Sequence, residues 1–114
     1  MKEIIAVIRP EKWSATREAV RSLGVQDVCH QRVLGRGRQG GLTYLQPVSK
    51  EGGVGILFLT KRMVVWAVAD KMVNKCLRAI IQVNQSGNHG DGKVFVCPLD
   101  RAVGAASSSA VREA

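Results

Sequence analysis

The sequence predicts an α+β fold in which two strand–helix–strand units share one four-stranded antiparallel sheet, with both helices on the same face. Short apolar, β-branched runs alternate with amphipathic stretches of helical period, and the two halves of the chain have the same order and similar lengths. Hydrophobic residues make up 46% of the 114 residues. A chain of this size and apolar content forms one domain with its own core.

The first unit ends near residue 35. Ile-Ile-Ala-Val-Ile at residues 4–8 is apolar and β-branched, and predicts a buried strand. Apolar positions within residues 13–24 have helical spacing, with Ser14 as the expected N-cap and Gly24 as the expected C-terminal stop. Residues 25–35 alternate in part between apolar and polar, which predicts a half-exposed strand.

The second unit repeats this order. Residues 59–69 are mostly apolar and predict a strand, and Asp70 is placed to cap the helix that follows. Gly87 is expected to end this helix, and residues 94–99 predict the last strand. Six residues at helical spacing form the expected buried face of the helix: Val73, Cys76, Leu77, Ile80, Ile81 and Asn84.

This order of elements, βαββαβ, is that of a ferredoxin-like sandwich. The helices cover one face of its sheet, so the other face meets either water or another subunit. Residues 64–68 contain no polar side chain, and we therefore expect both faces of that strand to be buried. Burial of the second face implies an oligomer.

Composition also limits the function. Seventeen Lys and Arg against nine Asp and Glu give a net charge of +8, which favours anionic partners. The three cysteines form no C-x-x-C pair, so neither a zinc site nor a disulfide framework is expected. The apolar run at the start is too short for a signal peptide or a membrane span, which predicts a cytoplasmic protein without membrane insertion.

Two glycine-rich segments carry the candidate site. Residues 87–93 join a predicted helix to a predicted strand, and residues 35–55 hold seven glycines and no helical period. Backbone N–H groups in glycine turns can form an anion-binding concavity, to which Lys93 and Arg38 would add charge. The alternative interpretation is a tight turn and a solvated basic loop, and the pattern alone leaves both open.

Three stretches resemble the PII nitrogen-regulatory signal transduction family. They are KEIIAVIRPEK at the start, VLGRGRQGG at the opening of the long loop and GDGKVFVCPLDRAV near the end. The resemblance covers residues 1 to about 103, and VNQSG and RVLGRG are most similar to the branch encoded beside nitrogenase genes. It implies a homotrimeric ferredoxin-like domain at residues 1–103, a long T-loop at about 37–58 that docks onto a target, and a flexible tail at 104–114.

The resemblance also implies ligands. ATP or ADP would bind in clefts between subunits, and 2-oxoglutarate would chelate a magnesium ion bound to ATP. Arg9 and Lys61 match positions at the 2-oxoglutarate site, together with Gln39, which would also ligate the magnesium. The implied nucleotide-binding residues are Val7, Gly35, Gly37, Arg38, Gln39, Gly90, Asp91, Gly92 and Lys93.

The chain departs from the family after its last strand. The family has an Arg-x-Arg-Thr-Gly-Glu segment whose arginines reach the phosphates, whereas this chain has Gly104-Ala105-Ala106-Ser107, with only Arg101 nearby. Loss of two charge-assisted contacts would cost several kcal/mol, at roughly 1.5–3 kcal/mol each. Weaker nucleotide binding is therefore expected, and with it a weaker magnesium-dependent response to 2-oxoglutarate.

The expected function is regulation, without enzymatic activity, of a nitrogen-metabolism target such as nitrogenase or an ammonium transporter. One alternative is a PII paralogue that binds proteins without sensing nucleotides, in mixed trimers with an intact relative. A further alternative is RNA binding, since RNA-recognition motifs share this topology. For base stacking the third expected strand offers only Trp66 and the last only Phe95, and the consensus run of such motifs is absent, so no nucleic-acid partner is expected.

Overall fold

The computed structural model describes residues 1–35, 59–88 and 90–106. The predicted T-loop at 37–58 and most of the predicted tail lie outside these ranges. The elements are the strands β1 (Lys2–Ile8), β2 (Asp27–Gly35), β3 (Leu59–Val68) and β4 (Gly92–Pro98), the helices α1 (Trp13–Arg21) and α2 (Val73–Asn84), and the short 3-10 turns η1 (Pro10–Lys12) and η3 (Asp70–Met72).

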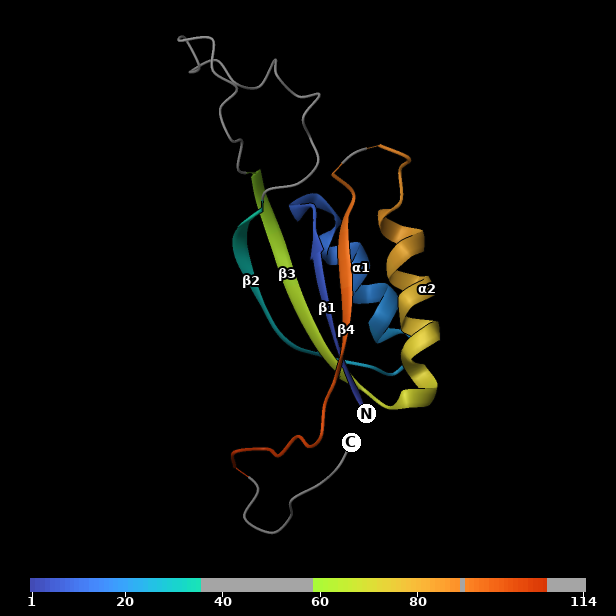
Figure 1. Cartoon of the computed structure of the whole chain (residues 1–114). Coiled ribbons are helices and arrows are strands. Elements are labelled where there is room, and N and C mark those ends of the chain that lie inside the picture. Colours follow the sequence, from blue (N-terminus) through green and yellow to red (C-terminus); the bar gives the residue numbers. More distant parts are fainter. Residues whose placement is uncertain (36–58, 89, 107–114) are drawn as a thin grey trace, which may run out of the picture.

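The four strands form one antiparallel sheet in the order β2-β3-β1-β4. Both helices lie on the same face of this sheet (Figure 1). The predicted ferredoxin-like βαββαβ sandwich is therefore confirmed. Its central strands, β1 and β3, each pair on both edges, whereas β2 and β4 are the edge strands.

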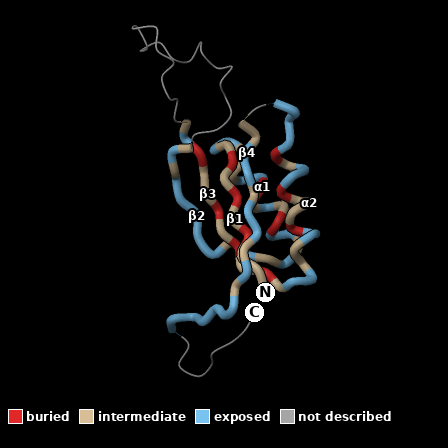
Figure 2. Tube along the Cα trace, in the orientation of Figure 1, coloured by how far each residue is buried: buried red, intermediate tan, exposed pale blue. Residues whose placement is uncertain are grey.

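The core lies between the sheet and the helices (Figure 2). Alternate residues of β1 and β3 point into it, as the period of a strand requires, and the helices contribute one residue per turn. Its fully buried members are Ile4, Ala6, Ile8, Val20, Val64, Trp66, Val68, Cys76 and Ile80. The expected face of α2 is correct except at Ile81, which is 49% exposed.

The expected helix starts are wrong, because each helix is preceded by a 3-10 turn. Pro10 presets the φ angle of the first turn, so the chain is already helical when it reaches Ser14. In the second unit Asp70 is the first residue of η3, with Ala69 before it as the cap residue. The Asp70 carboxylate instead pairs with the amino group of Met1 at 2.7 Å and with Lys2 Nζ at 3.2 Å.

The last strand begins two residues earlier than expected. Gly92 pairs with Ile8, and Lys93 pairs with Val7, so both glycine-loop residues belong to β4. Helix α2 likewise ends at Asn84, three residues before the expected stop at Gly87, because Gln85 has an extended backbone. The connection between α2 and β4 is thus residues 85–91.

The centre of the sheet face away from the helices is apolar and only partly covered in a single chain. On β3 the helix-facing residues from Val64 to Val68 are buried, whereas Met63, Val65 and Ala67 on the other side are intermediate in exposure. On β4, Phe95 lies beside Ile5 and is 49% exposed. One face of β3 is thus buried within the chain, and the expected burial of the second face depends on a partner.

Candidate functional site

Four segments of the chain meet at one end of the sheet. Because neighbouring strands are antiparallel, the ends of β1 and β2 lie beside the starts of β3 and β4. The loop after α2 returns to this same end (Figure 1). Val7 and Arg9, Gly35, Lys61 and residues 90–93 are therefore brought together, as the resemblance implies for the binding site.

The carbonyl oxygen of Gly90 is the centre of this cluster. It accepts a hydrogen bond from Lys61 Nζ at 2.8 Å and another from Arg9 Nε at 3.1 Å. Two cations, one directly after β1 and one in β3, therefore converge on one backbone oxygen, which holds the loop against the sheet. The carbonyl carries no formal charge, so the negative charge near these two cations comes from carboxylates such as that of Asp91.

Lys61 is 6% exposed, and its environment disfavours the charged ammonium. Burial lowers the pKa of Lys61, and the nearby guanidinium of Arg9 lowers this pKa further. The carboxylates of Glu11 and Asp91 act in the opposite direction but more weakly. An anion placed beside Lys61 would therefore stabilise its charged form.

Asp91 is fixed by hydrogen bonds from Ser86, five residues earlier. The backbone N–H of Ser86 donates to Asp91 Oδ2 at 2.8 Å, and the Ser86 hydroxyl donates to Asp91 Oδ1. Arg9 lies 3.5 Å from Asp91 Oδ1. The Ser86 bonds, and to a smaller extent Arg9, hold the pKa of Asp91 below its ordinary value.

Replacing Ser86 by alanine should raise the pKa of Asp91, because the hydroxyl donor to its carboxylate is lost. Since a depressed carboxyl pKa contributes stability above the unfolded pKa and loses it as pH falls through the folded pKa, the variant should be less stable than wild type at neutral pH, and this difference should shrink in acid. The measurement is NMR titration of the Asp91 carboxyl carbon. Ser22→Ala, which removes a hydroxyl bonded to Ala19, is the control. An unchanged Asp91 titration in Ser86→Ala would contradict the assignment.

Two glycines allow the close packing of this cluster. At Gly92 the φ angle is +120°, and a Cβ there would lie 2.2 Å from the carbonyl oxygen of Val7. At Gly35 a Cβ would lie 2.8 Å from Lys61 Cγ, so this glycine makes room for the lysine side chain. The two glycines thus determine how closely β4 and Lys61 approach their neighbours.

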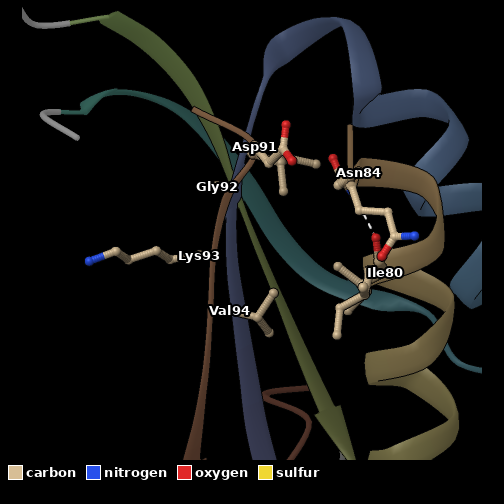
Figure 3. A pocket seen from close by; sticks show the side chains of 9 residues that line it. Ile80, Asn84, Asp91, Gly92, Lys93 and Val94 are labelled. Atoms are coloured by element: carbon tan, nitrogen blue, oxygen red, sulfur yellow. Dashed lines mark hydrogen bonds between the residues drawn. The ribbon is translucent and has the colours of Figure 1, made fainter. Parts of the chain in front are cut away.

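A cavity of about 160 Å³ lies between the end of α2 and the start of β4. Apolar side chains such as Ile80 and Val94 line much of it, with Asn84 and Asp91 at one end (Figure 3). Lys93 extends from the opposite side of β4 and points away from this cavity (Figure 3). Its ammonium is therefore directed to the open face of the sheet, next to its strand partner Val7.

Other predicted site residues are not brought into the cluster. Gly37, Arg38 and Gln39 lie outside the described residues. Arg101 follows β4, whose last residues pair with the start of β1, so it lies at the end of the sheet opposite the 85–91 connection of the same chain. Arg101 can thus reach a comparable cluster only on another subunit.

Sequence reasoning missed two polar features. The sequence pattern predicted no role for Ser86, because a serine five residues before an aspartate is not a recognisable motif. Asn84 was expected only on the apolar face of its helix. It is 6% exposed, and its amide donates to Thr16 Oγ1 at 2.9 Å and to the Ile80 carbonyl at 2.8 Å, which links α2 to α1.

The fold and the cluster define a ferredoxin-like sandwich whose chemically active groups surround a glycine loop at one end of the sheet. The family model for "Nitrogen regulatory protein P-II" matches residues 1–107. The chain belongs to this P-II (PII) family, which confirms the resemblance seen in the sequence.

Relatives from two groups are similar to the chain. The nitrogen fixation nifHD region GlnB-like protein 2 of Methanobacterium ivanovii is 39% identical over 110 residues, covering 90% of this chain and 89% of the relative. The protein of the same name from Methanothermobacter marburgensis is 40% identical over 109 residues, covering 90% of both. The nitrogen regulatory protein P-II of Haemophilus influenzae is 37% identical over 103 residues, covering 90% of this chain and 89% of the relative.

Proteins of this family are regulatory signal transducers, and the chain is accordingly a nitrogen-regulatory PII-type protein. Within the described residues, neither helix has the length and apolar character needed to cross a bilayer.

Proposed function

We propose that this protein senses adenine nucleotide, together with 2-oxoglutarate, at clefts between subunits, and controls a nitrogen-metabolism target in the cytoplasm through residues 37–58. In this role it is a regulator and not an enzyme. The observation that carries the proposal is the convergence of Lys61 and Arg9 on the Gly90 carbonyl, beside the glycine loop. Family membership and the similarity to nifHD-region relatives support the same role.

The cations suit a dicarboxylate. Lys61 and Arg9 are held within hydrogen-bond distance of one oxygen, so a carboxylate of 2-oxoglutarate could take the bonds that the Gly90 carbonyl now accepts. It would also relieve the unfavourable environment of the lysine ammonium. Magnesium bound to the nucleotide would supply the second charge that a chelating dicarboxylate needs, with Gln39 as its protein ligand by family resemblance.

Lys93 supports a nucleotide site that is completed by another subunit. Its side chain is exposed and leaves β4 on the open face, away from the cavity under α2 (Figure 3). Val7, expected near the base, is its partner on that face. Phosphates bound by Lys93 and the loop glycines would thus lie where a neighbouring subunit covers the sheet.

The proposed subunit arrangement is a homotrimer. The open face presents Ile5, Met63, Val65 and the half-exposed Phe95, and its burial would stabilise an assembly by about 25 cal/mol per Å² of apolar surface. Light scattering coupled to gel filtration should give about three times the chain mass of 12.3 kDa. A monomer at micromolar concentration would contradict both the trimer and the shared nucleotide site.

Calorimetric titration with ATP and AMP tests nucleotide sensing. Replacing Lys93 by alanine should weaken ATP binding by about 1.5–3 kcal/mol, roughly ten- to a hundredfold, because a charge-assisted contact is lost. Lys75→Ala, which removes an exposed lysine from α2, is the matched control and should have little effect. Arginines introduced at Gly104 and Ala106 should tighten ATP more than AMP, since the added charge would face the outer phosphates.

A PII paralogue that binds proteins without sensing nucleotides is the second candidate. The observation in its favour is the segment Gly104–Ala106, where the family has phosphate-binding arginines. The titration separates the two candidates. If wild type binds neither nucleotide at millimolar concentration and the added arginines change nothing, the protein-binding paralogue is the better description.

A further inference from the structure

A second concentration of charge surrounds the indole ring of Trp13 at the start of α1. The His30 ring lies with its centroid 4.3 Å from the Trp13 ring centroid, at an interplanar angle of 36°. The guanidinium carbons of Arg17 and Arg62 lie 5.2 and 5.8 Å from the centre of the same ring. One half-buried tryptophan from α1 therefore organises side chains from α1, β2 and β3.

The strand register adds Arg32 to this group. Arg62 pairs with Ile8, whose side chain is buried beneath the helices, so Arg62 lies on the helix-covered side of the sheet. Arg32 pairs directly with Arg62 and shares that side, and His30 precedes Arg32 by two residues on the same strand face. Arg32 and His30 are exposed. We call Trp13, Arg17, His30, Arg32 and Arg62 the Trp13 surface.

The positive charge of this surface is only partly balanced. Asp27 Oδ1 accepts a hydrogen bond from Arg17 Nε at 3.0 Å, in an ion pair with an Asp27 side chain that is 8% exposed. In the described part of the chain, no carboxylate forms an ion pair with Arg32 or Arg62. Like charges directly opposite one another on neighbouring strands are destabilising. The contact of Arg62 with the Trp13 ring offsets part of this repulsion, but no carboxylate of the described residues neutralises the opposed pair.

We propose that the Trp13 surface docks an acidic segment of a partner protein. Carboxylates match the planar guanidinium groups in geometry, and two of them could bridge the opposed pair Arg32 and Arg62. The guanidinium groups of Arg17 and Arg62 lie within about a Debye length of each other, so an acidic segment experiences their combined field.

An acidic protein segment fits this surface better than a single-stranded nucleic acid. Nucleic-acid sites of that kind use free aromatic faces on which bases stack. Three groups of this chain already lie within 6 Å of the Trp13 ring centre, so the ring positions cations.

The surface lies next to the place where residues 36–58 depart from the sheet. Arg32 is three residues before Gly35 at the end of β2, and Arg62 is three residues after Leu59 at the start of β3. A target held by those residues would thus be within reach of the Trp13 surface. Binding of an acidic segment here needs neither nucleotide nor 2-oxoglutarate, so its test is independent of the function proposed above.

Fluorescence anisotropy of a labelled peptide of alternating glutamate and serine, without nucleotide, tests the proposal. The double variant R32Q/R62Q should bind this peptide about tenfold more weakly than wild type, and the difference should shrink at high salt. The control K75Q/R78Q removes the same net charge from exposed positions of α2 and should bind like wild type. The same peptide with glutamine in place of glutamate should not bind.

Thermal unfolding distinguishes docking residues from structural ones. Because the opposed arginines repel each other, R32Q should leave the melting temperature unchanged or raise it, whereas a structural role predicts a decrease. Equal weakening by R32Q/R62Q and K75Q/R78Q, or no binding by wild type, would overturn the proposal. Tighter binding of an oligothymidylate of matched length, lost in R32Q/R62Q, would assign the surface to nucleic acid instead.

Discussion

Replacing Gly92 by alanine should lower the free energy of unfolding by about 3 kcal/mol or more. Gly92 has a φ angle of +120°, which an L-residue rarely adopts, and the new Cβ would lie 2.2 Å from the Val7 carbonyl oxygen. Relief of this contact requires β4 to move away from β1 at the pairing of Gly92 with Ile8. Chemical unfolding followed by circular dichroism measures the loss.

Gly87→Ala is the matched control for this substitution. Gly87 also has a positive φ angle, +80°, but a Cβ there would have no heavy atom within 4 Å. Gly87→Ala should therefore lower the free energy of unfolding only by the cost of placing an L-residue at a positive φ angle, about 1–2 kcal/mol. If the two variants lose equal stability, the positive φ angle alone explains the loss in Gly92→Ala. The close approach of β4 to β1 would then add nothing to that loss.

Replacing Asn84 by aspartate should destabilise the protein by about 2–4 kcal/mol at neutral pH. The change keeps the shape of the side chain but replaces a donor by a carboxylate at a site that is 6% exposed. The Ile80 carbonyl would lose its amide donor and face an anion, and the Thr16 hydroxyl already donates to the Lys12 carbonyl. Unfolding of variant and wild type across a pH series measures the effect.

The pH dependence identifies the cause of this loss. Burial should raise the pKa of the new carboxyl in the folded state above its unfolded value of about 4. Below the pKa of the unfolded state the carboxyl is protonated in both states and costs little stability. As pH rises through the raised pKa of the folded state, the buried carboxyl must ionise and the stability is lost. The difference from wild type should therefore be small in acid and grow with pH. A constant difference, or an equal one for the exposed Asn88→Asp, would contradict this account.

These two substitutions change residues that stabilise the structure around the charged cluster. Gly92 and Asn84 hold the ends of β4 and α2 in place, whereas Lys61, Arg9 and Lys93 carry the charges proposed to meet ligands. The Gly90 carbonyl connects the two groups, because both cations donate to it. A shift of the backbone at Gly92 should therefore also displace the Gly90 carbonyl, two residues earlier, and with it the side chains of Lys61 and Arg9.

The sequence by itself determined the βαββαβ order, because periodicity of two and of 3.6 residues is a local property. It also marked both glycine loops and Lys93, whereas Arg9 and Lys61 were indicated only by the resemblance to the PII family. It misplaced the helix starts at Ser14 and Asp70, because preceding 3-10 turns compete with side-chain caps, and one-residue differences in where a turn begins are not visible in composition.

Only the tertiary structure decided which charges meet. Lys61 and Gly90 are 29 residues apart in the chain, and the register of β1 with β3 and β4 brings them within 2.8 Å. That register likewise sends Lys93 to the open face and sets Arg32 opposite Arg62. Strand pairing fixes such contacts because a shift of one residue would turn each side chain to the other face of the sheet. The alternation within one strand favours one face, but the residues that lie opposite it belong to segments far apart in the chain.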